Sequence, residues 1–105
     1  MPPLAIEIDK DKLRDFCRRW KITEFALFGS VTRPEEFHDD SDVDVLARFT
    51  KDAPWTLFDW PAMERELAHV FSRPVDLVEW EAVEHSDNPY RKRSILDSVV
   101  LLDVA

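Results

Sequence analysis

The spacing of apolar residues along this chain predicts two amphipathic helices. Between residues 9 and 20 the apolar positions fall at i, i+3, i+4 and i+7, which is one stripe of a helix, and Asp9 is placed to cap its start. A second stripe runs from Trp60 to Phe71, with Pro61 near the first turn, where a missing N–H costs little. The two stripes consist of Leu13, Phe16, Cys17 and Trp20, and of Trp60, Met63, Leu67, Val70 and Phe71.

Four segments rich in β-branched and aromatic residues predict strands, and Asn88-Pro89 predicts the start of a last helix that ends near Asp97. The link between the first two strands is too short for a crossover helix, so these strands are predicted to pair antiparallel. The resulting fold class is α/β (α+β), a small mixed sheet with helices packed mainly on one face and the other face partly free for a site. The predicted strands are 23–28, 43–49, 75–80 and 99–102.

The chain has 105 residues, which is the size of one domain, so residues 1–105 are predicted to form a single unit. Hydrophobic residues make up 45% of it, including four Trp and seven Phe, and this composition favours a packed core over disorder. A single cysteine, Cys17, excludes an intramolecular disulfide and a thiolate zinc site. The sequence has neither a signal-peptide pattern nor a membrane-spanning apolar run, so a cytoplasmic protein without membrane contact is expected.

The charge balance restricts the expected partners further. Fourteen Lys and Arg residues against 22 Asp and Glu residues give a formal net charge of −8. This charge repels the phosphates of a duplex, so direct binding to duplex nucleic acid is not expected. A metal-neutralised nucleotide or a basic protein remains compatible, because bound divalent ions invert the local sign of an acidic site.

Gly29 is the only glycine in the chain, and it directly follows the first predicted strand. This placement predicts a positive φ or a close approach of other atoms to the backbone at that point. The N–H groups after Gly29, together with the Ser30 hydroxyl, could form a nest for a phosphate. A Gly-Ser pair is by itself more often a simple turn, so the neighbouring residues decide the interpretation.

Three aspartates are placed to meet beside this turn. Asp42 and Asp44 are two residues apart at the start of a strand, so both carboxylates point to one face with their Cα atoms about 6.6 Å apart. Asp76 interrupts an apolar strand, where a lone buried carboxylate would be costly. If the second and third strands are neighbours, the three carboxylates form a Mg²⁺ site of the kind used in nucleotidyl transfer. Taken singly, an Asp-x-Asp pair is usually a solvated strand entry.

Arg48 and the basic segment from Tyr90 to Arg93 can each be interpreted in two ways, as part of a binding site or as ordinary surface charge. Arg48 shares the face of Asp42 and Asp44 and could reach a phosphate, although an ion pair with a neighbouring acid is favoured. The segment from Tyr90 to Arg93 is the only basic cluster, for which a solvated helix face is the simpler interpretation and a partner contact the alternative.

The pattern of Gly29-Ser30, eleven intervening residues, Asp42-Val43-Asp44 and then Asp76 resembles the minimal nucleotidyltransferases, the MNT family of the DNA polymerase β-like superfamily. The resemblance covers nearly the whole chain, including the first helix, the helix before Arg73-Pro74 and the closing helix. It implies the polymerase β-like nucleotidyltransferase fold, with two Mg²⁺ ions as cofactors and ATP as substrate.

Carried onto this chain, the resemblance implies that Gly29 and Ser30 hold the triphosphate and that Arg33 supports them. The residues implied as metal ligands and catalytic residues are Asp42, Asp44 and Asp76, the last also as the possible base. Two departures from the family pattern touch the loop over the phosphates. The spacing between Ser30 and the first aspartate is one residue longer than the commonest family pattern, and Pro34 stands where glycine is usual.

Proteins with this pattern are often encoded beside a HEPN ribonuclease toxin. The resemblance therefore implies an antitoxin that transfers AMP from ATP to a hydroxyl of that toxin, expected to be a tyrosine, and neutralises it within a hetero-oligomer of the two proteins. Two alternatives stay open: an antitoxin that acts by binding and occlusion without catalysis, and a nucleotidyltransferase that modifies small molecules. A chain of 105 residues is short for a second, acceptor-binding domain, which favours a protein acceptor.

Overall fold

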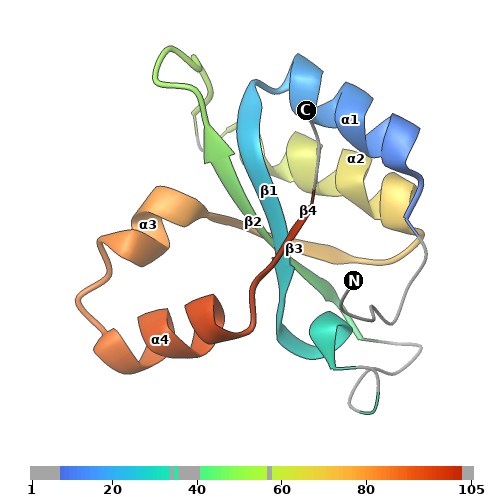
Figure 1. The fold of residues 1–105 in the computed structure, drawn as a ribbon. Helices are drawn as coiled ribbons and strands as arrows, with labels where there is room; N and C mark the ends of the chain where they lie inside the picture. Colours follow the sequence, from blue (N-terminus) through green and yellow to red (C-terminus); the bar gives the residue numbers. More distant parts are fainter. Residues whose placement is uncertain (1–7, 34, 36–40, 57, 103–105) are drawn as a thin grey trace.

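The computed structural model describes residues 8–33, 35, 41–56 and 58–102, and its centre is a four-stranded mixed sheet with strand order β3-β2-β1-β4 (Figure 1). Strand β1 pairs antiparallel with β2 and with β4, whereas β2 pairs parallel with β3. This architecture confirms the predicted fold class and the antiparallel first pair. In chain order the elements are α1 (Lys10–Arg19), β1 (Ile22–Phe28), the 3₁₀ turn η1 (Gly29–Thr32), β2 (Val43–Phe49), α2 (Trp60–Phe71), β3 (Val75–Glu79), α3 (Trp80–Glu84), α4 (Pro89–Asp97) and β4 (Val100–Leu102).

The helices start where the local sequence favours a start. Asp9 caps α1 by accepting a hydrogen bond from Lys12 N at 3.2 Å. Asn88 caps α4 by accepting hydrogen bonds from Tyr90 N and Arg91 N. Helix α2 has Pro61 in its first turn. The three predicted helices are thereby confirmed. No helix in the described ranges has the length and apolar character needed to cross a membrane.

One face of the sheet is covered by α1 and α2, and the larger core lies between them and the strands. Alternate residues of β1 and β2 point into this core, as the two-residue repeat of a strand requires. Cys17 lies in it, and burial raises the pKa of its thiol to about 12, so this thiol is unreactive at neutral pH. The core includes Leu13, Phe16, Phe25, Leu27, Val31, Val43, Val45, Met63 and Leu67.

The opposite face of the sheet carries α3 and α4 (Figure 1). Helix α3 is absent from the sequence prediction, because five residues are too few to show a helical repeat of apolar positions. Strand β3 ends at Glu79, and Trp80, expected as its last residue, begins α3 instead. These two helices cover only part of the face, and Asp76 near the start of β3 remains exposed. The second, smaller core consists of Ala26, Phe28, Leu46, Val83 and Ile95.

Candidate active site

Two aspartates stand side by side on the neighbouring strands β2 and β3. The parallel register pairs Asp44 with Asp76, and residues paired in this way point to the same face of a sheet. Asp42 lies two residues before Asp44, directly before β2 begins, and is exposed. The structure therefore brings the three predicted acidic residues to one end of β2 and β3, on the face that carries α3 and α4 further along the strands.

Asp44 is the most perturbed carboxyl group of this site. Its pKa is raised from 3.8 to about 6, first because the side chain is partly buried and then because of the negative charges of Asp76 and Asp42. Asp76 is paired with Asp44 in the strand register and Asp42 lies two residues before Asp44, so their negative charges repel one another. A group of like charges is costly to bring together, so the arrangement favours a cation beside Asp44.

Gly29 is required at this site for two independent reasons. Its backbone φ of +75° lies in the left-handed region, where residues with a side chain are strained. A Cβ atom on Gly29 would also lie 2.4 Å from Asp44 Oδ2, far inside van der Waals contact. The cause is the antiparallel pairing of Phe28 with Asp44, which brings the turn after β1 against the side chain at the start of β2. The predicted positive φ and close approach at Gly29 are both confirmed.

Short hydrogen bonds close the turn η1 that follows Gly29. The Thr32 hydroxyl donates to Gly29 O at 2.7 Å, and Arg33 N donates to Ser30 O at 2.9 Å. The Gly29 N–H donates to Ser98 Oγ at 3.3 Å, so the end of α4 supports the turn from behind. The role of Ser98 escapes sequence analysis because the two residues are 69 positions apart and no motif joins them.

Replacing Ser98 with alanine tests this support. The variant leaves the Gly29 N–H without its partner, so we expect the free energy of unfolding to fall by about 1 kcal/mol and nucleotide affinity to fall several-fold. Thermal unfolding and titration with ATP and Mg²⁺ measure the two effects. Ser94→Ala is the matched control on the same helix, because the Ser94 side chain is exposed. Equal melting and equal affinity in the two variants would contradict a supporting role.

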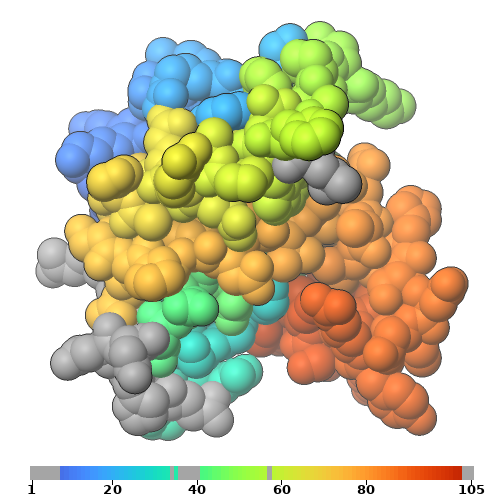
Figure 2. Space-filling view, turned by 180° about the vertical axis from the view of Figure 1, so that it is seen from behind, coloured from blue at the N-terminus to red at the C-terminus, as the bar shows by residue number. Residues whose placement is uncertain are grey.

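The remaining predicted binding residues lie around this turn. Ser30 is partly buried within η1, and Arg33 is exposed just after it. Figure 2 shows the η1 segment and the start of β2 together at the surface, below β3. Pro34, one of the two departures from the family pattern, lies outside the described residues, as does most of the loop that leads to Ser41. Among the predicted residues, Gly29, Asp44 and Asp76 form the structural centre of the site.

The donor atoms of the site fit a hard divalent cation such as Mg²⁺. Carboxylate oxygens are its preferred protein ligands, and a cation relieves the repulsion that raises the pKa of Asp44. Within the part of the chain that the structure describes, no three acidic, histidine or cysteine side chains are already gathered closely enough to hold a metal. Asp42 and Asp76 are exposed, so the fit is one of donor chemistry and is completed by rotation of these side chains.

Arg48 does not point its charge at this site. Its guanidinium pairs with Glu24 and with Glu84, at 2.8 Å in each case, and lies 5.2 Å from the centre of the Trp80 ring. The pairs raise the pKa of Arg48 and lower that of Glu84. The simpler of the two sequence interpretations, an ion pair with a neighbouring acid, is confirmed.

A family model described as "Nucleotidyltransferase domain" matches residues 10–102 of this chain. The chain belongs to the nucleotidyltransferase domain family. The match includes both sides of the site, from the Gly29 turn to the Asp44 and Asp76 pair, and ends with β4. A comparison with curated proteins finds no significant match for this nucleotidyltransferase domain.

Several solved structures share the fold. A chain from a crystal structure of a toxin–antitoxin with AMP-PNP aligns over 90% of this chain and 72% of its own length, at 18% identity and a TM-score of 0.67. A candidate minimal nucleotidyltransferase aligns over 89% of this chain and 88% of its own, at 26% identity and a TM-score of 0.65. A chain from the complex of a tri-AMPylated Shewanella oneidensis HEPN toxin with its MNT antitoxin aligns over 88% of this chain and 66% of its own, at 17% identity and a TM-score of 0.57.

Proposed function

We propose that this nucleotidyltransferase domain is an antitoxin that uses ATP and Mg²⁺ to transfer AMP to a hydroxyl group, in a tyrosine, of a HEPN toxin. The observation that carries the proposal is the register of Asp44 with Asp76 beside a glycine that admits no side chain. A carboxylate pair next to a tight backbone turn suits a metal-bound triphosphate, because the acids hold the cations and the turn holds phosphate oxygens.

Solved structures with the same fold support a toxin protein as the acceptor. One of them contains the ATP analogue AMP-PNP in a toxin–antitoxin, and another contains a HEPN toxin that carries three AMP groups together with an MNT antitoxin. The identities of 17–18% support the fold directly and the acceptor only by analogy.

In the proposed reaction, the acceptor hydroxyl oxygen forms a bond to the α-phosphorus of ATP, and the bond from that phosphorus to the bridging oxygen breaks. Pyrophosphate leaves, and the hydroxyl proton goes to Asp76, which is exposed and adjacent to Asp44. Asp42, Asp44 and Asp76 would hold Mg²⁺, and the Gly29-Ser30 turn would orient the triphosphate, with Arg33 in support. Mg²⁺ bound there would neutralise negative charge on the phosphates.

The test is intact mass spectrometry of a cognate HEPN toxin after incubation with this chain, ATP and Mg²⁺. We expect a mass gain of one or more AMP groups, and no gain with the variant Asp42→Asn/Asp44→Asn. Asp11→Asn/Asp87→Asn is the matched control, because it removes two exposed acids outside the site and should leave transfer unchanged. AMP transfer by the Asp42→Asn/Asp44→Asn variant at the wild-type rate would refute the proposed site.

Neutralisation by binding alone is a second candidate, favoured by the longer spacing between Ser30 and Asp42 and by Pro34 in the loop over the phosphates. The same incubation separates the two candidates. A stable complex of toxin and wild-type chain with no mass gain, in the presence of ATP and Mg²⁺, would support occlusion and contradict transfer.

A further inference from the structure

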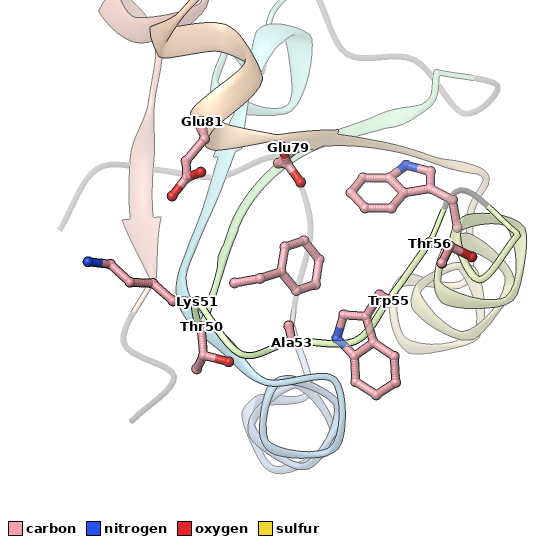
Figure 3. A pocket seen from close by; sticks show the side chains of 9 residues that line it. Thr50, Lys51, Ala53, Trp55, Thr56, Glu79 and Glu81 are labelled. Atoms are coloured by element: carbon pink, nitrogen blue, oxygen red, sulfur yellow. The ribbon is translucent and has the colours of Figure 1, made fainter.

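A second concave site lies at the other end of the sheet (Figure 3). It has a volume of about 560 Å³, which is within the range of pockets that hold a small molecule or a group from a partner. Phe49, the last residue of β2, lines it, and Asp44 lies five residues earlier on the same strand, about 16 Å away. The pocket is therefore separate from the candidate active site and can bind a ligand independently of it.

The aromatic walls of the pocket are held in fixed positions. The indole N–H of Trp55 donates to Trp20 O at 2.6 Å, and that of Trp60 donates to Leu77 O at 2.9 Å. The rings of Phe49 and Trp60 pack with their centres 5.6 Å apart. Because both indole N–H groups are bonded to the backbone, the rings present carbon surface and π electrons to the pocket.

Two carboxylates lie on the opposite rim, and both lack a cationic partner among the described residues. Glu79 ends β3 and Glu81 is in the first turn of α3, and neither forms an ion pair there, whereas nearby Glu84 pairs with Arg48. Figure 3 shows the Glu79 carboxylate directed into the pocket, and the ammonium of Lys51, which also lines it, directed outward. Aromatic rings facing unpaired carboxylates form an environment that attracts an organic cation.

An exposed aromatic residue beside the pocket indicates that the cation belongs to a protein. Phe58 is 95% exposed and lies in the turn between Thr56 and Trp60, which both line the pocket. The Phe58 ring makes almost no contact within the fold, so it is available to pack against a partner that covers the pocket. A free metabolite inside the pocket would leave this ring in water.

We propose that this pocket receives an arginine side chain of a partner protein, with Phe58 packing on an apolar residue next to that arginine. A guanidinium suits the site better than an ammonium, because its plane stacks on indole rings while its edge pairs with carboxylates. The volume leaves room for the arginine and part of its neighbouring residue. The proposal does not depend on nucleotidyl transfer, since no residue of the pocket belongs to the candidate active site.

The first experiment titrates the full chain with N-acetyl-arginine methylamide and follows tryptophan fluorescence and the amide spectrum by NMR. We expect a dissociation constant on the order of millimolar, and binding at least about fivefold weaker for the uncharged citrulline analogue. Glu79→Gln/Glu81→Gln should remove the preference for arginine, and Asp11→Asn/Asp87→Asn, which loses the same charge elsewhere, should retain it. Equal binding of arginine and citrulline compounds to the wild-type chain would overturn the proposal.

The second experiment separates a protein partner from a free cation. An acetylated Leu-Arg-Leu amide should bind more tightly than the single arginine compound, and Phe58→Ala should reduce the peptide affinity to that of the single residue. The Phe58 side chain is exposed, so this variant folds as the wild type does. Spermidine that binds more tightly than the peptide, with no effect of Phe58→Ala, would assign the pocket to a free polyamine and refute protein docking.

Discussion

Gly29→Ala is expected to give a folded protein that no longer transfers nucleotide. The alanine Cβ would lie 2.4 Å from Asp44 Oδ2, and since Asp44 belongs to a central strand, its side chain must rotate away. That rotation removes the proposed metal ligand from its position, and we expect a loss of at least about 100-fold in rate, as misplacement by one ångström can cause. The positive φ of 75° adds a strain of about 1–3 kcal/mol, so thermal unfolding should also occur at a lower temperature.

A double-mutant cycle separates the two effects of the Gly29 substitution. In the background Asp44→Ala the steric conflict disappears and only the backbone strain remains. Gly29→Ala should therefore destabilise the wild-type chain more than it destabilises the Asp44→Ala chain, as measured by denaturant unfolding. A wild-type level of AMP transfer in Gly29→Ala would show that the contact between the turn and Asp44 has no role in the reaction.

Asp44→Asn is expected to abolish transfer and at the same time to stabilise the metal-free fold. The pKa of Asp44 is raised to about 6 by burial and by two neighbouring carboxylates, so at neutral pH its charge opposes folding. The full shift corresponds to about 3 kcal/mol, and because the group is about half exposed, solvent screening reduces our expectation to about 1 kcal/mol. For a domain of this size, that change raises the unfolding temperature by about 4–8 °C.

The raised pKa of Asp44 also determines how the free energy of unfolding changes with pH. Between pH 4 and pH 6 the folded state holds a proton on Asp44 that the unfolded state releases, so wild-type stability falls as the pH rises through this range. The advantage of Asp44→Asn in EDTA should be small at pH 4 and complete above pH 7. Mg²⁺ should stabilise the wild type and not the variant, because ligand binding to the folded state raises its stability. An advantage that is the same at both pH values would contradict a charge effect.

The strands and the positions of Gly29, Asp44 and Asp76 in the fold could be predicted from local patterns and from the order of the elements. The bounds 43–49 of β2 follow from its apolar run, and the only glycine follows β1 at the place where the backbone needs a left-handed residue. The proximity of Asp44 and Asp76 follows from the chain order, because the helix between their strands permits a parallel pairing of neighbours. The first two of these predictions depend on residues close together in the sequence, and the third depends only on the order of the elements along the chain.

The features that could not be predicted depend on contacts between distant residues. The Gly29 N–H contacts Ser98, which lies between α4 and β4, and no local pattern marks that serine. Arg48 shares a strand face with the acids, yet its partners Glu24 and Glu84 come from β1 and α3. The pocket with Trp55 and Trp60 likewise combines a loop, a helix start and two strand ends. The pattern of apolar residues predicts each element but does not predict that these segments lie next to one another.

Because the chain is synthesised from its N-terminus, the hydrogen bond between Gly29 and Ser98 can form only late in translation. The turn is synthesised in the first third of the chain, but its support at Ser98 and the adjoining strand β4 follow 69 residues later. A nascent chain that has emerged from the ribosome only as far as residue 97 lacks both. Nascent chains stalled before this point should bind ATP and Mg²⁺ poorly, so the site becomes competent only when translation of the domain is nearly finished.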